Sequence, residues 1–181
     1  MNSENGALRW YAVRAFWNKT DSLIREARDA GFETYYAVRT IDSVESGKLE
    51  YKQEPLIPSV FFVKCNLDWL VDFKFRHNSQ LFLYRDKPGG KPAPIRDDEM
   101  KVFIMVTSAH NEKYQVEYLG EAKPKYVMGD RVRVTEGIYK GAEGVVVRIK
   151  KDRKLVVAIS GVAVVAISHI PQCYLEKVDT K

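Results

Sequence analysis

The sequence contains few of the residues on which catalytic, metal and disulfide sites depend. Its two cysteines, Cys65 and Cys173, lie far apart and form no C-x-x-C pair, so neither a disulfide framework nor a structural zinc site is predicted. The three histidines stand in separate segments, and the sequence has no glycine-rich phosphate loop, H-E-x-x-H helix or G-x-S-x-G elbow. We therefore expect a binding protein, not an enzyme, without a cofactor or bound metal.

Long hydrophobic runs are also missing. The longest purely apolar stretch, Val162 to Ile167, is far shorter than the roughly 20 residues that a membrane-spanning helix needs. Residues 1–9 show no apolar run behind a basic segment. The expectation is a cytoplasmic protein that does not associate with membranes. With 181 residues, 45% of them hydrophobic, the chain has room for one large or two small domains.

The net charge of +5 is unevenly distributed. Residues 1–112 hold 16 lysines and arginines against 16 acidic residues, whereas residues 126–181 hold 10 against 6. A basic excess suggests an anionic partner, and the location of the excess matters more than its sum. Any contact of the N-terminal part with nucleic acid must then use a local basic patch.

The N-terminal part, residues 1–109, alternates strand-like and helix-like patterns. Aromatic and branched residues favour strands, a 3.6-residue apolar period favours helices, and Gly31, Asn66 and Asp97 stand where helix ends are expected. The order predicts a βαββαβα domain, an antiparallel sheet flanked by helices. Its expected elements are a strand at 8–16, a helix capped by Thr20 or Asp21, a strand at 33–41 and a hairpin loop at 42–48, then an apolar strand at 60–63, a helix capped by Asn66, a strand at 81–84 and a helix capped by Asp97.

The C-terminal part, residues 126–181, has the pattern of several short strands. Val132 and Val134 alternate with arginines, a glycine-punctuated loop follows, and further apolar runs are separated by tight turns. Residues 110–125 show no long apolar period and contain Pro124, so we interpret them as a linker. The prediction is an α+β chain with two domains.

The glycine-punctuated stretch resembles the KOW module, a small barrel present in NusG-type transcription factors and in some ribosomal proteins. Three glycines spaced around one aromatic residue, after a leading Gly-Asp, are more than an ordinary hairpin requires. The matching positions are Gly129, Asp130, Val132, Val134, Gly137, Tyr139, Gly141, Gly144 and Val146.

The N-terminal part resembles the NusG N-terminal domain. The stretches that carry the resemblance are Trp10-Tyr11-Ala12-Val13-Arg14-Ala15-Phe16 and Pro55-Leu56-Ile57-Pro58-Ser59-Val60-Phe61-Phe62-Val63, with Pro92-Ala93-Pro94-Ile95 as a third match. An RNA-recognition domain shares the βαββαβ order. Residues 58–65, however, keep only Phe62 and Val63 of its signature.

This resemblance implies a transcription elongation and antitermination regulator. Its N-terminal domain would dock on the clamp helices of the largest subunit of bacterial RNA polymerase, and its KOW domain would recruit a ribosomal protein, Rho or RNA. A monomer is expected. By position, the polymerase-docking candidates are Trp10, Tyr11, Phe16, Ile57, Pro58, Val60 and Phe61, about half of which must instead fill the core. Candidates to contact upstream or non-template DNA are Arg14, Lys19, Arg25, Lys74, Arg76 and His77.

Departures from the usual family pattern favour a specialised paralogue, of the UpxY or RfaH type. Ile57-Pro58-Ser59-Val60 stands where many members have Phe-Pro-Gly-Tyr, and the turn that often meets the KOW partner is Ile159-Ser160-Gly161-Val162. The alternative function is a ribosome-associated or other RNA-binding protein in which the basic turn from Lys150 to Lys154 holds phosphates.

Overall fold

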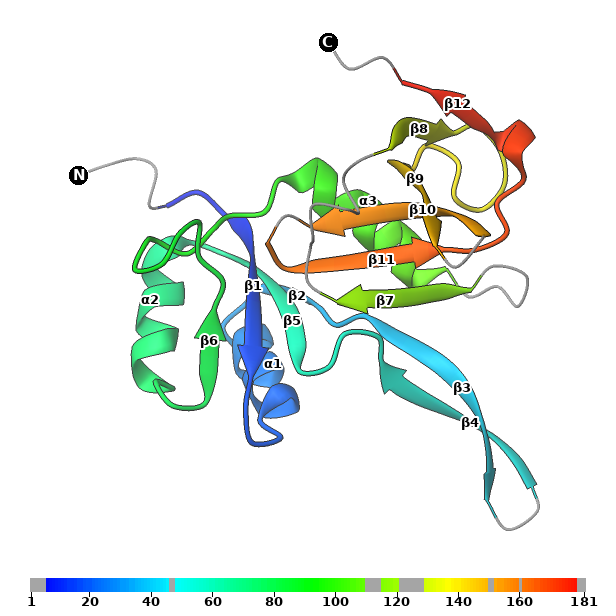
Figure 1. Ribbon diagram of the computed structural model, residues 1–181. Coiled ribbons are helices and arrows are strands. Elements are labelled where there is room, and N and C mark those ends of the chain that lie inside the picture. Colours follow the sequence, from blue (N-terminus) through cyan, green and yellow to red (C-terminus); the bar gives the residue numbers. More distant parts are fainter. Residues whose placement is uncertain are drawn as a thin grey trace. The chain divides into compact units, whose positions relative to one another are not determined.

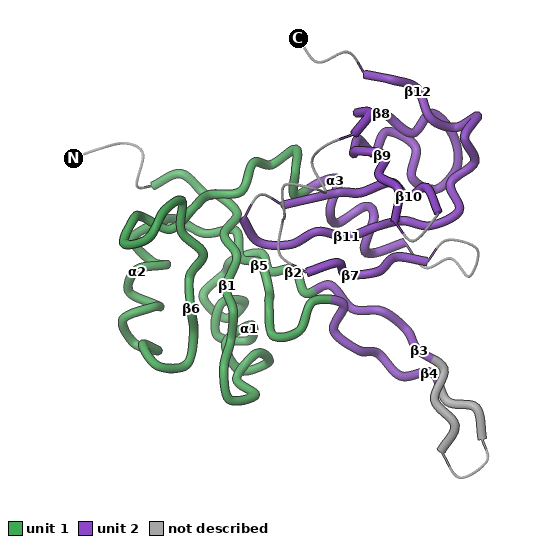
Figure 2. The backbone as a smooth tube through the Cα atoms, in the orientation of Figure 1, with its two compact units in different colours: residues 1–36, 57–100 green, residues 37–56, 101–181 purple. Residues whose placement is uncertain are grey.

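The structure is a computed structural model. It describes residues 6–45, 48–109, 115–120, 129–149, 152–159 and 161–178, and for residues 42–45 and 48–50 it describes the backbone only. The chain divides into two compact units, residues 1–36 with 57–100 and residues 37–56 with 101–181 (Figure 2). The units divide the chain after residues 36, 56 and 100, and the predicted domain boundary at residue 109 stays a prediction.

The first unit is an antiparallel four-stranded sheet with two helices that follow its strands in the chain. Its strand order is β2-β5-β1-β6, so the first strand of the chain lies inside the sheet, between β5 and β6 (Figure 1). The elements are β1 (Arg9–Ala15), α1 (Thr20–Asp29), β2 (Glu33–Tyr35), β5 (Val60–Cys65), α2 (Leu67–Arg76) and β6 (Leu81–Leu83).

Side chains at alternate positions of the strands form the core of this unit. Tyr11 and Val13 of β1 lie in register with Val63 and Phe61 of β5, and these side chains share one face of the sheet. Both helices bury their apolar residues against that face. The helix residues of the core are Leu23, Ile24 and Ala27 of α1 and Leu70 and Phe73 of α2.

Side-chain capping sets the start of α2 but not of α1. The Asn66 side chain accepts a hydrogen bond of 2.8 Å from the backbone N–H of Trp69, which confirms the predicted cap. At α1 the cap position is Lys19, one residue before the expected Thr20 and two before Asp21, and its side chain makes no cap hydrogen bond.

The predicted strand at 33–41 is two strands. β2 ends at Tyr35 and pairs with β5, whereas β3 (Val38–Glu45) pairs only with β4 (Lys48–Pro55) as a separate two-stranded ribbon (Figure 1). Ala37 between them is buried and its carbonyl accepts the N–H of Leu56 at 2.8 Å. The chain therefore changes sheet at this point, a change that a continuous β pattern does not reveal.

The C-terminal part is a six-stranded antiparallel, barrel-like sheet in the order β12-β8-β9-β10-β11-β7. Before it comes α3 (Asp97–Ser108), which starts where the sequence predicts. The strands are β7 (Val116–Gly120), β8 (Asp130–Val134), β9 (Glu143–Ile149), β10 (Asp152–Ile159), β11 (Ala163–Ile167) and β12 (Leu175–Lys177).

Strand β7 corrects the linker interpretation for part of the segment 110–125. Residues 116–120 pair with β11, in a register that joins Val116 to Ile167 and shifts at a bulge between Val164 and Val165. Val116, Tyr118 and Leu119 are half-buried. A five-residue strand is too short to produce a long apolar period, which is why the sequence pattern did not indicate it.

Two glycines of the barrel are required by close backbone approach. A Cβ on Gly144 would stand 2.5 Å from the carbonyl oxygen of Val156, and one on Gly129 would collide with the carbonyl oxygen of Val146. Gly144 lies in β9 opposite Val132 of β8, and Gly129 directly precedes Asp130, which pairs with Val146 of β9. Glycine at these places lets neighbouring strands approach where any side chain would push them apart.

Candidate functional site

The face of the first sheet that does not carry the α1 and α2 core forms a second set of side chains. On β1 it holds Trp10, Ala12 and Arg14, and these lie in register with Lys64, Phe62 and Val60 of β5. We call these residues, with Phe82 of β6 and the adjoining Tyr84, the second sheet face. Trp10, Ala12, Val60, Phe62 and Tyr84 of this face are buried, whereas Phe82 is exposed, so only the end of the face at Phe82 is an apolar surface open to a partner.

Two cations stand over aromatic rings on the second sheet face. The Lys64 ammonium lies 5.9 Å from the centre of the Trp10 ring, and the Arg14 guanidinium lies 5.6 Å from that of Tyr84. Arg14 is opposite Val60 on one side and Phe82 on the other. The ring attracts the cation electrostatically, and the Lys64 ammonium also lies 3.6 Å from Oδ1 of Asp97.

One end of this sheet presents exposed aromatic side chains. Phe16 is 42% exposed, Trp17 80% and Phe82 46%. Backbone hydrogen bonds of 2.7 Å, from Ala15 N–H to the Ser59 carbonyl and from Phe16 N–H to the Gln80 carbonyl, join three connecting segments at this end. These hydrogen bonds therefore fix the backbone from which the aromatic side chains at this end project.

The same end contains three non-glycine residues with positive φ. Trp17 and Asn18 both have φ of 55°, and Ser59 has φ of 60°. Such left-handed conformations cost roughly 1–3 kcal/mol each and concentrate at functional sites. Their grouping in the loops after β1 and before β5 supports a functional assignment for this end of the sheet.

The structure separates the predicted polymerase-docking residues. Trp10 and Val60 belong to the second sheet face, whereas Tyr11 and Phe61 lie in the core under the helices, and all four are buried. Of the others, Phe16 and Pro58 are exposed and Ile57 is buried. Sequence reasoning missed Trp17, Phe82 and Tyr84; Phe82 lies between the buried Leu81 and Leu83, so alternation would have pointed it to the second face.

Three of the predicted nucleic-acid residues are engaged within the first unit. The Lys74 ammonium donates to the carbonyls of Leu81, at 2.7 Å, and Asn78, and burial followed by the charge of Arg85 lowers the pKa of this lysine. Arg76 and His77 both contact the Glu26 carboxylate, His77 at 2.8 Å from Nε2 to Oε2. These contacts tie α2 to α1 and to β6.

Lys19 and Arg25 are the predicted nucleic-acid residues with the most available charge. Both are exposed, and neither forms an ion pair with another residue in the part of the chain that the structure describes. Arg14 is half-buried beside Tyr84. The predicted set thus divides into structural cations and available ones.

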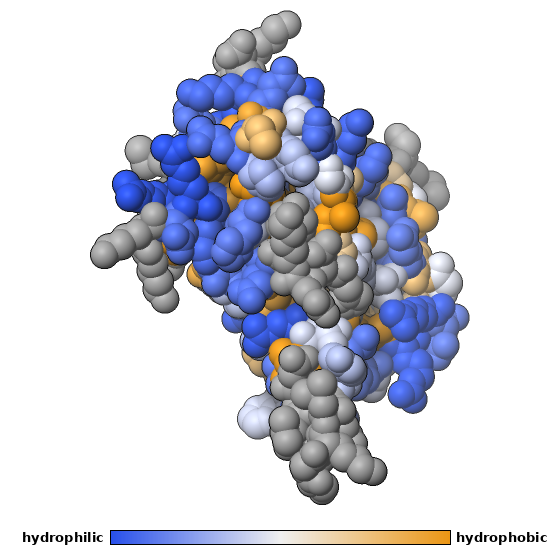
Figure 3. All heavy atoms as spheres, turned by 90° about the vertical axis from the view of Figure 1, so that its right-hand side faces the viewer, coloured by the Kyte–Doolittle hydropathy of each residue, from blue (hydrophilic) through white to orange (hydrophobic). Residues whose placement is uncertain are grey.

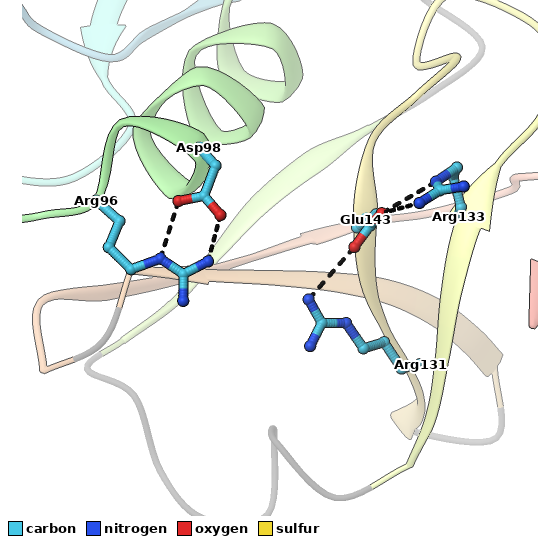
Figure 4. A network of polar contacts seen from close by, with 5 residues as sticks. All are labelled: Arg96, Asp98, Arg131, Arg133 and Glu143. Carbon is cyan, nitrogen blue, oxygen red and sulfur yellow. Dashed lines mark hydrogen bonds and ion pairs between the residues drawn. The ribbon is translucent and has the colours of Figure 1, made fainter. Parts of the chain in front are cut away.

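The KOW-like stretch is positioned by β8 and β9. Val132, Val134 and Tyr139 are buried, and Gly137 and Gly141 take the positive φ values of 81° and 89° that the turns around Tyr139 require. On the outer side, Glu143 accepts from Arg131 at 3.3 Å and from Arg133 at 2.6 Å (Figure 4). The hydrogen bonds from Arg133, with those from Arg131, hold the pKa of Glu143 below its usual range.

Figure 4 also shows a second ion pair, at the start of α3. Arg96 directs two guanidinium nitrogens at the Asp98 carboxylate, with Nε to Oδ1 at 2.9 Å. The hydrogen bond from Arg96 lowers the pKa of Asp98 to about 2. Both groups are exposed, and the acidic first turn suits the helix dipole, so this pair is a helix-start contact.

The predicted KOW partner turn is only partly on the surface. Ile159 and Val162 are buried, Gly161 is exposed with φ of 71°, and Ser160 lies outside the described residues. Of the basic turn from Lys150 to Lys154, residues 150 and 151 also lie outside them. Lys154 is half-buried and pairs with Glu117 of β7.

Within the described residues, no group of three or more histidine, cysteine or acidic side chains is placed to hold a metal. Burial raises the pKa of the Cys65 thiol to about 12, so this cysteine is an unreactive core residue.

Among the described residues, none of the helices is long and apolar enough to cross a membrane. The face drawn in Figure 3 is largely hydrophilic, with hydrophobic residues in small separate groups.

Comparison with protein families assigns both parts of the chain. The model of the KOW motif matches residues 128–159, and that of the family described as transcription termination factor NusG matches residues 8–104, more than half of the chain. The chain belongs to the NusG family. The N-terminal sheet with its flanking helices is thus the NusG N-terminal domain, and the barrel-like sheet is the KOW domain.

Solved structures include one NusG of similar length. The structure titled "Domain interaction in Thermotoga maritima NusG" is 20% identical, the alignment covers 95% of this chain and 98% of that one, and the TM-score is 0.47. A search of curated proteins returned no match. The family assignment therefore stands on the two family models.

Proposed function

We propose that this NusG-family chain is a transcription elongation and antitermination regulator that docks on bacterial RNA polymerase through its N-terminal domain. The partner surface on the polymerase would be the clamp helices of the largest subunit. The observation that carries the proposal is the exposed end of the second sheet face, where Phe82 lies opposite Arg14 and where Phe16 and Trp17, which follow β1, are also exposed. Large, rigid aromatic side chains beside a guanidinium are the composition of interface hot spots.

The docking geometry follows from the sheet. Phe82 and Arg14 are direct cross-strand neighbours, and Phe82 packs edge-on against Tyr84 at 5.5 Å between ring centres. A helix laid across these strands would bury the exposed parts of the aromatic rings, and Arg14 would meet a carboxylate on it. Upstream or non-template DNA would contact Lys19 and Arg25, which are exposed on α1 and the loop before it.

The KOW domain would recruit a second factor, for which a ribosomal protein, Rho and RNA are the candidates. Only Gly161 of the described residues in the turn between β10 and β11 is exposed. This small turn, and Ile57-Pro58-Ser59-Val60 in place of a more aromatic sequence, support a specialised paralogue of the UpxY or RfaH type.

Binding to core RNA polymerase tests the docking surface. The double variant Trp17→Ser with Phe82→Ser should raise the Kd at least 10-fold, since hot-spot truncations cost about 2 kcal/mol or more. The matched control is Val71→Ser with Phe75→Ser, which removes two side chains, 50% and 84% exposed, from α2. The control should bind within about twofold of the parent chain, and circular dichroism would verify that both variants are folded.

The proposal fails if the parent chain does not bind the polymerase, or if both double variants weaken binding equally. Transcription of a template with a long leader and terminators then tests regulation. The parent chain should increase read-through and Trp17→Ser with Phe82→Ser should not. Unchanged or increased termination with a polymerase-bound parent chain would contradict antitermination while leaving docking intact.

A further inference from the structure

The hairpin of β9 and β10 carries two positive charges directly opposite each other. Arg148 of β9 is the register partner of Arg153 of β10, and both residues are exposed. Side chains at directly opposed positions have their Cβ atoms about 4.5–5.5 Å apart, and like charges there destabilise the pair. An anion between or above the two guanidinium groups would replace this repulsion with favourable charge-assisted hydrogen bonds.

Other cations of the same sheet already have carboxylate partners. Arg131 and Arg133 share Glu143, Lys154 pairs with Glu117, and Lys177 lies 3.3 Å from Asp130. Arg148 and Arg153, by contrast, form no ion pair or hydrogen bond with any residue that the structure describes in this sheet. Their charge is therefore available.

The nearest acidic residue along the hairpin points to the other side. Asp152 is opposite Ile149, one step along both strands from the Arg148 and Arg153 pair. Because successive side chains of a strand alternate between faces, the Asp152 carboxylate and the two guanidinium groups project from opposite faces of the ribbon. The arginine pair thus forms a one-sided basic position.

The chemistry of the pair favours phosphate. Guanidinium groups are always charged, and their planar donors match phosphate oxygens in two-pronged hydrogen bonds. A single carboxylate would neutralise one arginine, whereas a nucleic-acid strand brings a series of phosphates past both. The excess of 10 basic over 6 acidic residues in 126–181, against 16 and 16 in 1–112, adds a favourable field at this end of the chain.

We propose that Arg148 and Arg153 form a binding site for the phosphate backbone of nucleic acid on the β9–β10 hairpin. The site is independent of the polymerase-docking surface and would give the KOW domain a nucleic-acid contact of its own. The site would recognise the charge and spacing of the phosphates, not the base sequence.

The test measures binding of the full chain to a 20-nucleotide oligouridine RNA and to a 20-base-pair DNA duplex by fluorescence anisotropy between 50 and 200 mM KCl. Removal of two phosphate contacts in Arg148→Gln with Arg153→Gln should flatten the slope of log affinity against log salt by about 1.4 for the RNA or about 1.8 for the duplex. Whichever of the two nucleic acids loses more affinity in the double variant is the preferred ligand of the site.

The matched control is Arg131→Gln with Arg133→Gln, which removes the same formal charge from the same sheet but from arginines already paired with Glu143. It should change the slope by less than about 0.5. Equal loss in both double variants, or no binding by the parent chain, would overturn the proposal. Displacement of the RNA by a 20-residue polyglutamate at equal charge concentration would also overturn it, in favour of an acidic protein partner.

Discussion

The two domains build their sheets from different side chains. The N-terminal sheet packs one face against α1 and α2 with large aromatic and aliphatic residues such as Phe61 and Phe73. The KOW sheet fills its interior mainly with smaller aliphatic residues from β8, β10 and β11, with Tyr139 as the large aromatic exception. A gap between a sheet and helices takes long side chains, whereas a small barrel closes on itself and needs short ones.

This difference affects where each domain is vulnerable. In the N-terminal domain, stability should depend on filling the space between sheet and helices. In the KOW domain, it should depend on how closely the strands approach. The three tryptophans, Trp10, Trp17 and Trp69, all lie in the N-terminal domain, so tryptophan fluorescence follows that domain and far-ultraviolet circular dichroism follows both.

The largest effect is expected for Phe73→Ala. This ring is fully buried and stacks on Trp69 at 4.6 Å between ring centres, so its removal should cost about 3–5 kcal/mol of unfolding free energy. The midpoint of the thermal transition seen by tryptophan fluorescence should fall by more than about 10 °C. Phe75→Ala, on the same helix but 84% exposed, is the matched control and should leave the midpoint within about 2 °C. Equal shifts for the two variants would contradict the assigned core.

An intermediate effect is expected for Gly144→Ala. The new Cβ would meet the Val156 carbonyl oxygen at 2.5 Å, so β9 and β10 must separate at a cost of about 1–3 kcal/mol. The KOW transition should move to lower temperature in circular dichroism while the tryptophan transition stays in place. Gly6→Ala, where a Cβ has no atom within 4 Å, should change neither transition. A shift of the tryptophan transition by Gly144→Ala would disprove independent cores.

The smallest effect is expected for Glu143→Gln. Its carboxylate, 28% exposed, bridges Arg131 and Arg133, and such a surface pair contributes less than about 1 kcal/mol. Because the folded state lowers the pKa of Glu143 below about 4.5, its contribution is present above that pH and is lost as the pH falls through the lowered pKa. The melting temperatures of the two proteins should therefore differ at pH 7, and the difference should shrink as the pH falls below 4.5 through the lowered pKa. A difference that stays constant as the pH falls would show that the effect is not electrostatic.

Local patterns in the sequence were sufficient to predict most elements. Asn66 identifies the start of α2 because capping by its side chain depends only on the neighbouring residues. Gly144 stands where two strands approach too closely for a Cβ. The β7 strand and the break between β2 and β3 were not predictable, since each depends on a partner strand distant in the chain. Of the predicted docking residues only Phe16 and Pro58 are exposed, because strand pairing and helix packing bury the other five; the docking surface itself stays a prediction.

The sequence by itself determined the family, the α+β class and the order of strands and helices, because these follow from residue spacing and from glycine and capping chemistry that act over a few positions. Only the tertiary structure decided which face of each strand is available. It placed Arg14 beside Phe82, paired Arg131 and Arg133 with Glu143, and set Arg148 opposite Arg153. Such pairings depend on strand register between distant segments, and a shift of one residue would turn every side chain to the other face.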